Sequence, residues 1–217
     1  MMKSMKDRYP ILFFDLDGTM TDSAPGILNG VRYAFQKMGN DSVVDIRYVG
    51  PPLLTSFQEY AHMSKKEAEQ AVYFYREYYN AENGGWKENR VYEGVPQMLE
   101  ALKNAGFRMA VATGKPIFPA KPILELFDLA KYFEYVSAAN DTNLFTKAQV
   151  IDHAMQMVGA SAERVLMIGD RHHDVEGGEA CGVDVLGVLY GYGTKEELSK
   201  AKYIAKTPLE ILEILEV

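Results

Sequence analysis

A four-residue apolar run, residues 11–14, is followed at once by two carboxylates, Asp15 and Asp17. The run does not alternate with polar residues, which is typical of a strand buried on both faces of a parallel sheet. A loop that only needs turn-forming residues would explain Asp17 and Gly18, but not a second acid directly against the strand. Ligands of open α/β sheets bind beyond the carboxyl ends of the strands. The run therefore predicts a parallel sheet with acidic groups at its ligand-binding edge.

Apolar runs of strand length recur along the chain, and helical spacing follows most of them. The expected strands are residues 108–113, 135–138, 164–168, 185–189 and 203–205, and the expected helices include residues 146–159, about 174–181 and a last one capped by Thr207. Strands that alternate with helices indicate a parallel sheet with right-handed crossovers. We therefore predict an α/β fold with a Rossmann-like parallel sheet core.

Residues 22–90 show helical periodicity only. Three helices are expected there, and the third begins at a capping box formed by Ser64 and Glu67. No strand pattern is visible between residues 20 and 91. An all-helical block directly after the first strand is an insertion into an α/β domain. We predict two domains, an α/β core of residues 1–21 and 91–217 and an inserted α-helical cap of residues 22–90.

Charge and composition exclude several classes of protein. The formal net charge of −7 argues against a nucleic-acid partner, which usually requires a basic face. Cys181 is the only cysteine, so an internal disulfide is impossible, and this fits a reducing cytosol. No segment reaches the roughly 18 uninterrupted apolar residues that a membrane span needs. We expect a cytoplasmic protein without a nucleic-acid or membrane partner.

Three of the expected strands end in polar residues that a parallel sheet would bring to one edge. They are followed by Asp15 and Asp17, by residues 113–115 (Thr-Gly-Lys), and by residues 170–174 with an acid at each end. Because the carboxyl ends of parallel strands share one edge, these groups are expected to meet in one crevice. This convergence is the main sequence evidence for an active site.

The same residues resemble the signatures of the haloacid dehalogenase superfamily of phosphohydrolases. The pattern Asp-x-Asp-x-Thr is met by Asp15, Asp17 and Thr19, the strand-end Thr by Thr113, the later Lys by Lys147, and the acidic cluster Gly-Asp-x-x-x-Asp by residues 169–174. Lys121 and Lys131 compete for the role of the Lys, but the order strand, Lys, helix, strand favours Lys147. The resemblance is closest to the phosphoglycolate phosphatase-like branch, in which a helical cap follows the first signature.

The resemblance implies a mechanism and a metal. Asp15 would be the nucleophile that forms an aspartyl-phosphate, and Asp17 would protonate the leaving oxygen and then activate water. Carboxylate and carbonyl oxygens favour Mg²⁺ over softer metals. The implied ligands are Asp15, the Asp17 carbonyl and Asp170, with Asp174 behind them. The competing interpretation of Asp170 and Asp174 is a helix cap on a solvated loop.

Substrate contacts are expected from the second and third signatures. The Thr113 hydroxyl and the Gly114 amide can donate to phosphoryl oxygens, and Lys147 adds a positive charge. Lys115 either contacts the phosphate or is simply solvated. Arg47, in a loop of the predicted cap, either contacts the substrate or packs within the cap. A cap that closes over the crevice would exclude water from the leaving group.

His172 and His173 suggest a zinc site, but one adjacent pair without cysteines or a third spaced histidine is a weak signal. We interpret them as loop residues near the pocket.

Taken together, the sequence predicts a magnesium-dependent phosphatase that acts on a small phosphorylated metabolite through an aspartyl-phosphate. Phosphoglycolate, a nucleoside monophosphate and a sugar phosphate all remain open as substrates. A phosphomutase of the same fold and a noncatalytic phosphometabolite-binding protein are the alternatives. The sequence leaves monomer and homodimer open.

Overall fold

The computed structural model describes residues 4–140, 143–144 and 146–217. The chain forms two compact units, one of Met1–Thr21 with Val91–Val217 and the other of Asp22–Arg90. The first unit contains a six-stranded sheet and the second contains three α-helices. The predicted α/β class with a helical insertion is confirmed.

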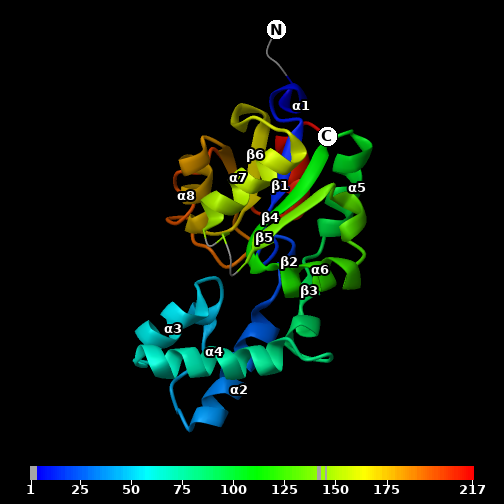
Figure 1. Cartoon of the computed structure of the whole chain (residues 1–217). Helices are drawn as coiled ribbons and strands as arrows, with labels where there is room; N and C mark the ends of the chain where they lie inside the picture. The colour runs from blue at the N-terminus through cyan, green and yellow to red at the C-terminus, as the bar shows by residue number, and fades with distance from the viewer. Residues whose placement is uncertain (1–3, 141–142, 145) are drawn as a thin grey trace. The chain divides into compact units, whose positions relative to one another are not determined.

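The sheet of the first unit has the strand order β5, β4, β1, β6, β7, β8, and all its described pairings are parallel (Figure 1). Its strands are β1 (Ile11–Phe14), β4 (Arg108–Pro116), β5 (Tyr135–Ala139), β6 (Val165–Gly169), β7 (Asp184–Val188) and β8 (Tyr203–Ala205). The central strand β1 is buried along its whole length, because neighbouring strands flank it and helices cover both faces. Its carboxyl end therefore lies between the ends of β4 and β6.

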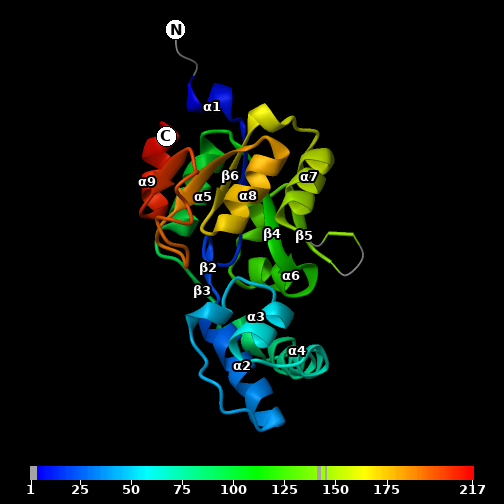
Figure 2. The same ribbon diagram turned by 90° about the vertical axis from the view of Figure 1, so that its left-hand side faces the viewer.

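Helices cover both faces of this sheet, as Figures 1 and 2 show. On one face α7 and α8 pack side by side, and on the other α5 packs against α9. The helices of the unit are α1 (Met5–Arg8), α5 (Val95–Asn104), α6 (Ile117–Leu126), α7 (Lys147–Val158), α8 (His172–Cys181) and α9 (Pro208–Ile214), with 3-10 turns η3 (Ala130–Tyr132) and η4 (Ala162–Arg164). Apolar side chains of α7 and the strands form one core cluster under the first pair of helices.

Two elements at the carboxyl edge differ from their predicted bounds. Strand β4 continues to Pro116 instead of ending at Thr113, and its pairing with β5 shifts register between those two residues. Helix α8 begins at His172, so His172 and His173 lie in its first turn and not in a loop as predicted. The helix begins earlier because the backbone N–H of Arg171 donates to Asp174, which closes the first turn (3.0 Å).

Helix caps explain why α7 begins where it does. The Thr146 hydroxyl accepts the N–H of Gln149, and the side-chain oxygen of Gln149 accepts the backbone N–H of Thr146. Gly159 ends the helix in a left-handed conformation, φ +65°. These caps place Lys147 in the first turn of α7. The Thr207 hydroxyl likewise accepts the N–H of Glu210 and caps α9, as the sequence predicts.

The second unit is built around the helices α2 (Ala24–Met38), α3 (Leu53–Tyr60) and α4 (Lys65–Tyr79), with 3-10 turns η1 (Ile46–Tyr48) and η2 (Gly85–Glu88). Its core is aromatic, since Phe35, Tyr48 and Phe57 are in mutual ring contact. Helices α2 and α4 approach closely where Gly30 faces the ring of Tyr75, because a Cβ at Gly30 would lie 2.7 Å from that ring. The predicted capping box at the start of α4 is present.

Two short strands, β2 (Thr21–Asp22) and β3 (Arg90–Val91), pair as a two-stranded sheet where the chain passes from one unit to the other. The prediction of no strand between residues 20 and 91 is wrong at these positions. Two residues are too few to show the alternation by which a strand is recognised in a sequence.

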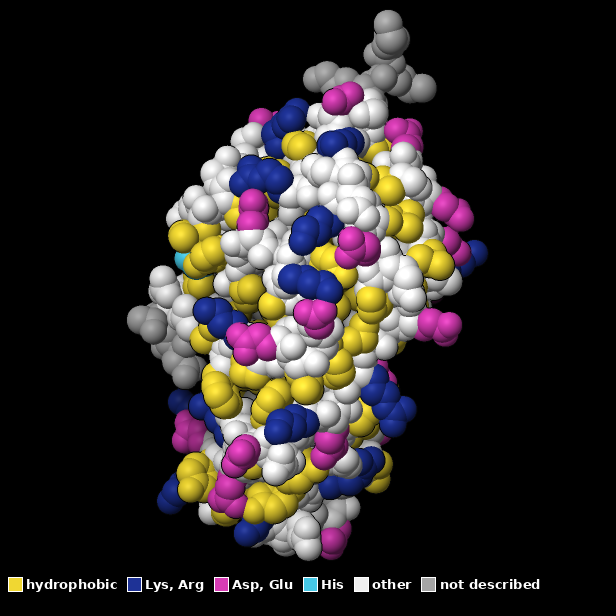
Figure 3. Space-filling view, turned by 90° about the vertical axis from the view of Figure 1, so that its right-hand side faces the viewer, with side chains coloured by type: hydrophobic (Ala, Val, Ile, Leu, Met, Phe, Trp, Pro, Cys, Tyr) yellow, Lys and Arg dark blue, Asp and Glu magenta, His cyan; other side chains and the backbone are white. Residues whose placement is uncertain are grey.

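The surface and the helices bear on two further expectations. On the face drawn in Figure 3, the described basic and acidic side chains are interspersed rather than gathered by sign. Within the described residues, every helix is too short or too polar to cross a membrane.

Candidate active site

The turn after β1 separates the two acids that follow it. The amide of Asp15 donates to the carbonyl of Ile168 on β6 (2.9 Å), which ties Asp15 to the neighbouring strand. The carbonyl of Leu16 then accepts the N–H groups of residues 19, 20 and 21, so the chain closes a tight turn. Gly18 adopts φ +83° in this turn, a left-handed conformation that favours glycine. Asp15 and Asp17 consequently acquire different partners.

Lys147 lies between two buried acids. Its Nζ is 2.7 Å from Asp15 Oδ1 and 2.7 Å from Asp174 Oδ1, and it also donates to the carbonyl of Ala112 (3.0 Å). Burial by itself lowers the pKa of Lys147, but the charges of Asp15 and Asp174 outweigh it and hold the pKa above its usual value. The lysine therefore stays charged although its side chain is only 8% exposed.

Asp17 pairs with a second lysine. Lys115 Nζ lies 2.8 Å from Asp17 Oδ2 and 3.1 Å from Oδ1, and the lysine side chain is only 5% exposed. The amide of Lys115 also donates to the hydroxyl of Thr113, which fixes the backbone at the end of β4 (3.1 Å). Of the two hypotheses for Lys115, this contact is evidence against a solvated side chain.

Asp170, directly after β6, is fully buried. It accepts the N–H of Tyr192 at Oδ2 (2.8 Å) and the hydroxyl of Thr19 at Oδ1 (3.4 Å). Burial raises the pKa of Asp170 well above its usual value, and the charges of Asp174 and Asp15 raise it further. Burial also raises the pKa of Asp174, although Lys147 opposes this shift. Both shifts come first from burial, and the neighbouring carboxylates add to them.

The backbone encloses the Asp170 carboxylate closely at two glycines. A Cβ on Gly18 would overlap the Asp170 carboxylate, and a Cβ on Gly191 would meet it and the carbonyl of Gly18. Side chains at these positions are therefore excluded by space, and at Gly18 also by its φ. The backbone at Gly18 and Gly191 can lie against the Asp170 carboxylate only because neither residue has a side chain.

The three acids Asp15, Asp170 and Asp174 fit a divalent cation. One oxygen from each lies within 4.8 Å of the others. With Asp17, four carboxylates share this edge with two lysines, Lys115 and Lys147, which leaves two negative charges in excess. A hard divalent cation would neutralise this excess, and carboxylate oxygens are the ligands that Mg²⁺ prefers.

One segment of the site is missing from the sequence predictions. Residues 190–193 (Tyr-Gly-Tyr-Gly) follow β7 and contact the acids from the side of β6. The Tyr190 hydroxyl donates to the carbonyl of Thr19 (2.9 Å), and Tyr192 donates its N–H to Asp170. The signal was available, because a glycine-rich turn at the carboxyl end of a parallel strand is a frequent ligand-site element.

Some predicted residues lie elsewhere. Arg47 is in the helical unit, where it pairs with Asp45 (2.8 Å) and stacks on the Tyr60 ring. Lys131 pairs with Asp128 at the surface, and Lys121 lies on α6. Of the three candidates for the later Lys, Lys147 is the one whose amine contacts Asp15. Gly114 is exposed on β4 between two buried residues.

Known proteins share this arrangement of sequence and fold. The model of the haloacid dehalogenase-like hydrolases matches residues 12–188. A 5'-nucleotidase of Pseudomonas aeruginosa is 38% identical over 201 residues, which cover 91% of this chain and 90% of that protein. The tyrosine-protein kinase PtkA of Mycobacterium tuberculosis is 37% identical over 194 residues, 88% of this chain and 65% of that protein. The structure of a predicted phosphatase from Clostridium acetobutylicum is 41% identical, with a TM-score of 0.88, and the match covers 97% of this chain and 100% of that one.

Proposed function

The chain belongs to the haloacid dehalogenase-like hydrolases and is a phosphatase of that family, and from this premise we propose that it hydrolyses small phosphomonoesters with Mg²⁺ through an aspartyl-phosphate. The observation that carries the proposal is the Asp15 carboxylate. It lies at the end of the central strand, held by Lys147, and beside two further buried acids. The lysine orients the carboxylate, and the two acids offer oxygen ligands for a cation beside it.

Asp15 is the proposed nucleophile. Lys147 Nζ holds Oδ1 at 2.7 Å, which leaves Oδ2 as the oxygen that attacks phosphorus. The new bond joins this oxygen to phosphorus while the bond from phosphorus to the ester oxygen breaks. The intermediate is a mixed anhydride, which water then hydrolyses to phosphate and a free Asp15 carboxylate.

Asp17 is the proposed acid and base. It gives a proton to the departing ester oxygen, which would otherwise leave as an alkoxide, and it takes a proton from the water that attacks the intermediate. Lys115 contacts the Asp17 carboxylate, and we propose that it orients this group. A contact from Lys115 to the substrate phosphate remains part of the proposal as a second role.

The phosphoryl oxygens are bound by groups at the end of β4. The Thr113 hydroxyl and the exposed Gly114 amide are the proposed donors, and Lys147 supplies positive charge from the first turn of α7. When bound, Mg²⁺ would neutralise phosphoryl charge, with Asp15, the Asp17 carbonyl and Asp170 as the proposed ligands and Asp174 behind them.

The substrate class follows from relatives and not from the phosphate-binding groups. The relative named 5'-nucleotidase supports a nucleoside monophosphate as the first substrate to test, before phosphoglycolate and sugar phosphates. We also propose that residues 22–90 act as a cap domain and that Arg47 on it selects the substrate. Arg47→Ala is then expected to raise KM for the preferred substrate, whereas Lys65→Ala, another exposed change in that unit, leaves it unchanged.

The test is phosphate release from a panel of nucleoside monophosphates, phosphoglycolate, sugar phosphates and a tyrosine-phosphorylated peptide, with and without Mg²⁺. Asp15→Asn keeps the shape and removes the nucleophilic charge, so its release of phosphate should be undetectable. Asp152→Asn, an exposed change on α7, is the matched control and should match the wild type. Mass spectrometry of the acid-quenched wild type should show one added phosphoryl group.

Three results would overturn the proposal. Asp15→Asn as active as the wild type would exclude Asp15 as the nucleophile. Phosphate release that needs a sugar bisphosphate activator would favour the phosphomutase, and binding of the panel without any turnover would favour a phosphometabolite-binding protein.

A further inference from the structure

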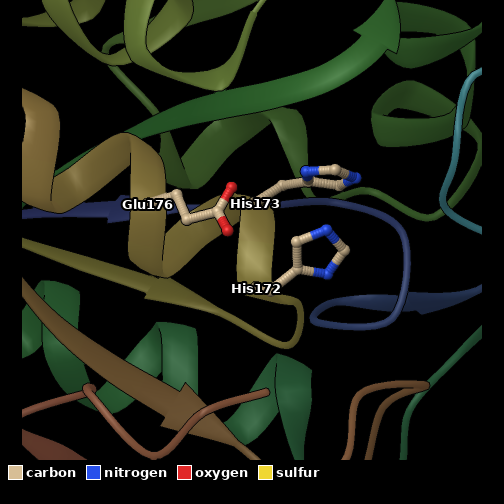
Figure 4. A group of neighbouring side chains, drawn as sticks. All are labelled: His172, His173 and Glu176. Carbon is tan, nitrogen blue, oxygen red and sulfur yellow. The ribbon is translucent and has the colours of Figure 1, made fainter.

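A second group of metal-ligating side chains lies on the first turn of α8, outside the carboxylate cluster. His172, His173 and Glu176 each present one ligand atom, and these atoms lie within 4.8 Å of one another. Figure 4 shows the two imidazole rings side by side with the Glu176 carboxylate next to them. We propose that these three residues form a binding site for a divalent transition metal such as Zn²⁺, separate from the site proposed for Mg²⁺.

Helical spacing brings the three ligands together. Glu176 is three residues after His173 and four after His172, and residues at these spacings are neighbours on a helix surface. Zn²⁺ binds imidazole nitrogen and carboxylate oxygen at about 2.0 to 2.2 Å, so its ligand atoms sit roughly 3 to 4 Å apart. Because the atoms lie within 4.8 Å of one another, they need to approach by less than about 2 Å. The exposed side chain of Glu176 is free to turn by that amount.

An outer carboxylate already orients one of the imidazoles. Nδ1 of His172 lies 3.4 Å from Glu197 Oε2, and Arg171 Nε donates to the same oxygen (2.8 Å). Metal-bound histidines usually donate their other ring N–H to a carboxylate in this way, which fixes the ring and its tautomer. Nε2 is then the His172 nitrogen left for a cation, and in Figure 4 one nitrogen of this ring faces His173 while the other faces away.

Donor type separates this site from the carboxylate cluster. Asp15, Asp170 and Asp174 offer oxygen only and are buried, whereas the second group offers two imidazoles and has one exposed member. Imidazole suits Zn²⁺, Cu²⁺ and Ni²⁺, while Mg²⁺ takes carboxylate, carbonyl and water oxygens. An excess of Mg²⁺ should therefore occupy the carboxylates and leave the second site for Zn²⁺. This inference does not depend on the proposed function.

The test is calorimetric titration of the full chain with Zn²⁺ in an excess of Mg²⁺. One Zn²⁺ per chain is expected to bind to the wild type. His172→Ala and Glu176→Gln each remove a ligand and should weaken binding by more than tenfold, and Glu197→Gln should weaken it about tenfold through loss of the outer carboxylate. The matched control is His62→Asn, which removes an exposed imidazole elsewhere and should bind like the wild type.

A second measurement guards against misfolded variants and against binding at the carboxylates. Zn²⁺ should raise the unfolding temperature of the wild type and of Asp15→Asn, but not that of Glu176→Gln, which should unfold like the wild type when Zn²⁺ is absent. Three results would overturn the proposal. These are no Zn²⁺ binding to the wild type, wild-type affinity in both ligand variants, and loss of binding in Asp15→Asn.

Discussion

The α/β unit carries a cluster of charged side chains at each end of its sheet, and the two clusters differ in exposure to water and in the ratio of acids to cations. At the amino end of β7, Asp184 contacts Lys202 Nζ (2.6 Å), Tyr9 Oη (2.5 Å) and Arg8 (3.6 Å), and its side chain is 38% exposed. At the carboxyl end, Asp174 contacts Lys147 Nζ at 2.7 Å, and its side chain is 1% exposed. The two lysine contacts are of similar length, but one lies at the surface and the other is buried.

The difference separates a surface ion pair from a functional site. Around Asp184 the cations outnumber the carboxylate and water screens all of them, so the cluster contributes little to folding. Around Asp174 the acids outnumber the lysines and water is excluded, an arrangement that costs free energy unless a further cation or substrate compensates it. Perturbed carboxylates of the second kind concentrate at functional sites. The predictions that follow test this contrast by the free energy of unfolding.

The largest effect is expected for Lys147→Met in the absence of divalent metal. The change leaves Asp15 and Asp174 buried without their cation and should lower the free energy of unfolding by about 3 to 5 kcal/mol. Lys202→Met removes the matching lysine at the other end and should cost less than about 1 kcal/mol. Urea unfolding of both variants measures the two values. Equal losses would show that the two clusters do not differ as described.

The next effect is stabilisation by Mg²⁺. A cation that binds only the folded chain at a hundred times its dissociation constant should raise the free energy of unfolding by about 2.7 kcal/mol. Thermal unfolding with Mg²⁺ or with a chelator measures this. Asp170→Asn should abolish the difference and Asp184→Asn should keep it. An Asp170→Asn variant that is stabilised as strongly as the wild type would place the cation elsewhere.

Gly18→Ala tests the close approach of the backbone to Asp170. The change places alanine in a left-handed backbone conformation and adds a Cβ that overlaps the carboxylate. It should lower the free energy of unfolding by about 2 kcal/mol or more. Gly159→Ala is the control, since Gly159 has φ +65° with open space around it and should cost only about 1 kcal/mol. If urea unfolding shows the same loss of free energy of unfolding for both variants, the turn does not confine the Asp170 carboxylate.

The smallest effect is a pH dependence at the amino end. Burial raises the pKa of Asp184, but hydrogen bonds from Lys202 and Tyr9 outweigh it, so the pKa of the folded chain lies below the usual value. A lowered carboxyl pKa stabilises the fold above the unfolded value of about 3.9, and this contribution disappears as the pH falls through the folded pKa. Because the side chain is well solvated, the contribution should stay below about 1 kcal/mol. Acid unfolding of Asp184→Asn and of the wild type measures this contribution. A difference above about 1 kcal/mol would contradict the description of Asp184 as a weak surface ion pair.

Much of the fold could be predicted because its signals are local. The apolar run of β1, the capping box of α4 and the Thr and Gly that bound α7 each lie within a few neighbouring residues. The gathering of Asp15, Thr113 and Asp170 at one edge also followed, since parallel strands place their carboxyl ends together. The structure shows these elements, and it places Lys147 beside Asp15.

The remaining features depend on contacts between residues far apart in the sequence, which local sequence patterns do not reveal. The contact of Lys115 with Asp17 joins residues 98 positions apart, and that of Tyr192 with Asp170 depends on the path of the loop after β7. The third ligand of the histidine pair was missed because the helix was expected to begin two residues later. An earlier start puts His172 and His173 in helical register with Glu176.

The central position of β1 has a consequence for folding during synthesis. Ile11 pairs with Arg108 on one side and with Val165 on the other, so the first strand made must wait for partners that are synthesised long afterwards. Contacts of such long range are slow to form, and an unpaired apolar strand is prone to aggregation. The contacts of residues 22–90 are closer in sequence, so this unit can fold while the strand waits. In the nascent chain β1 therefore stays unpaired until both β4 and β6 have been synthesised.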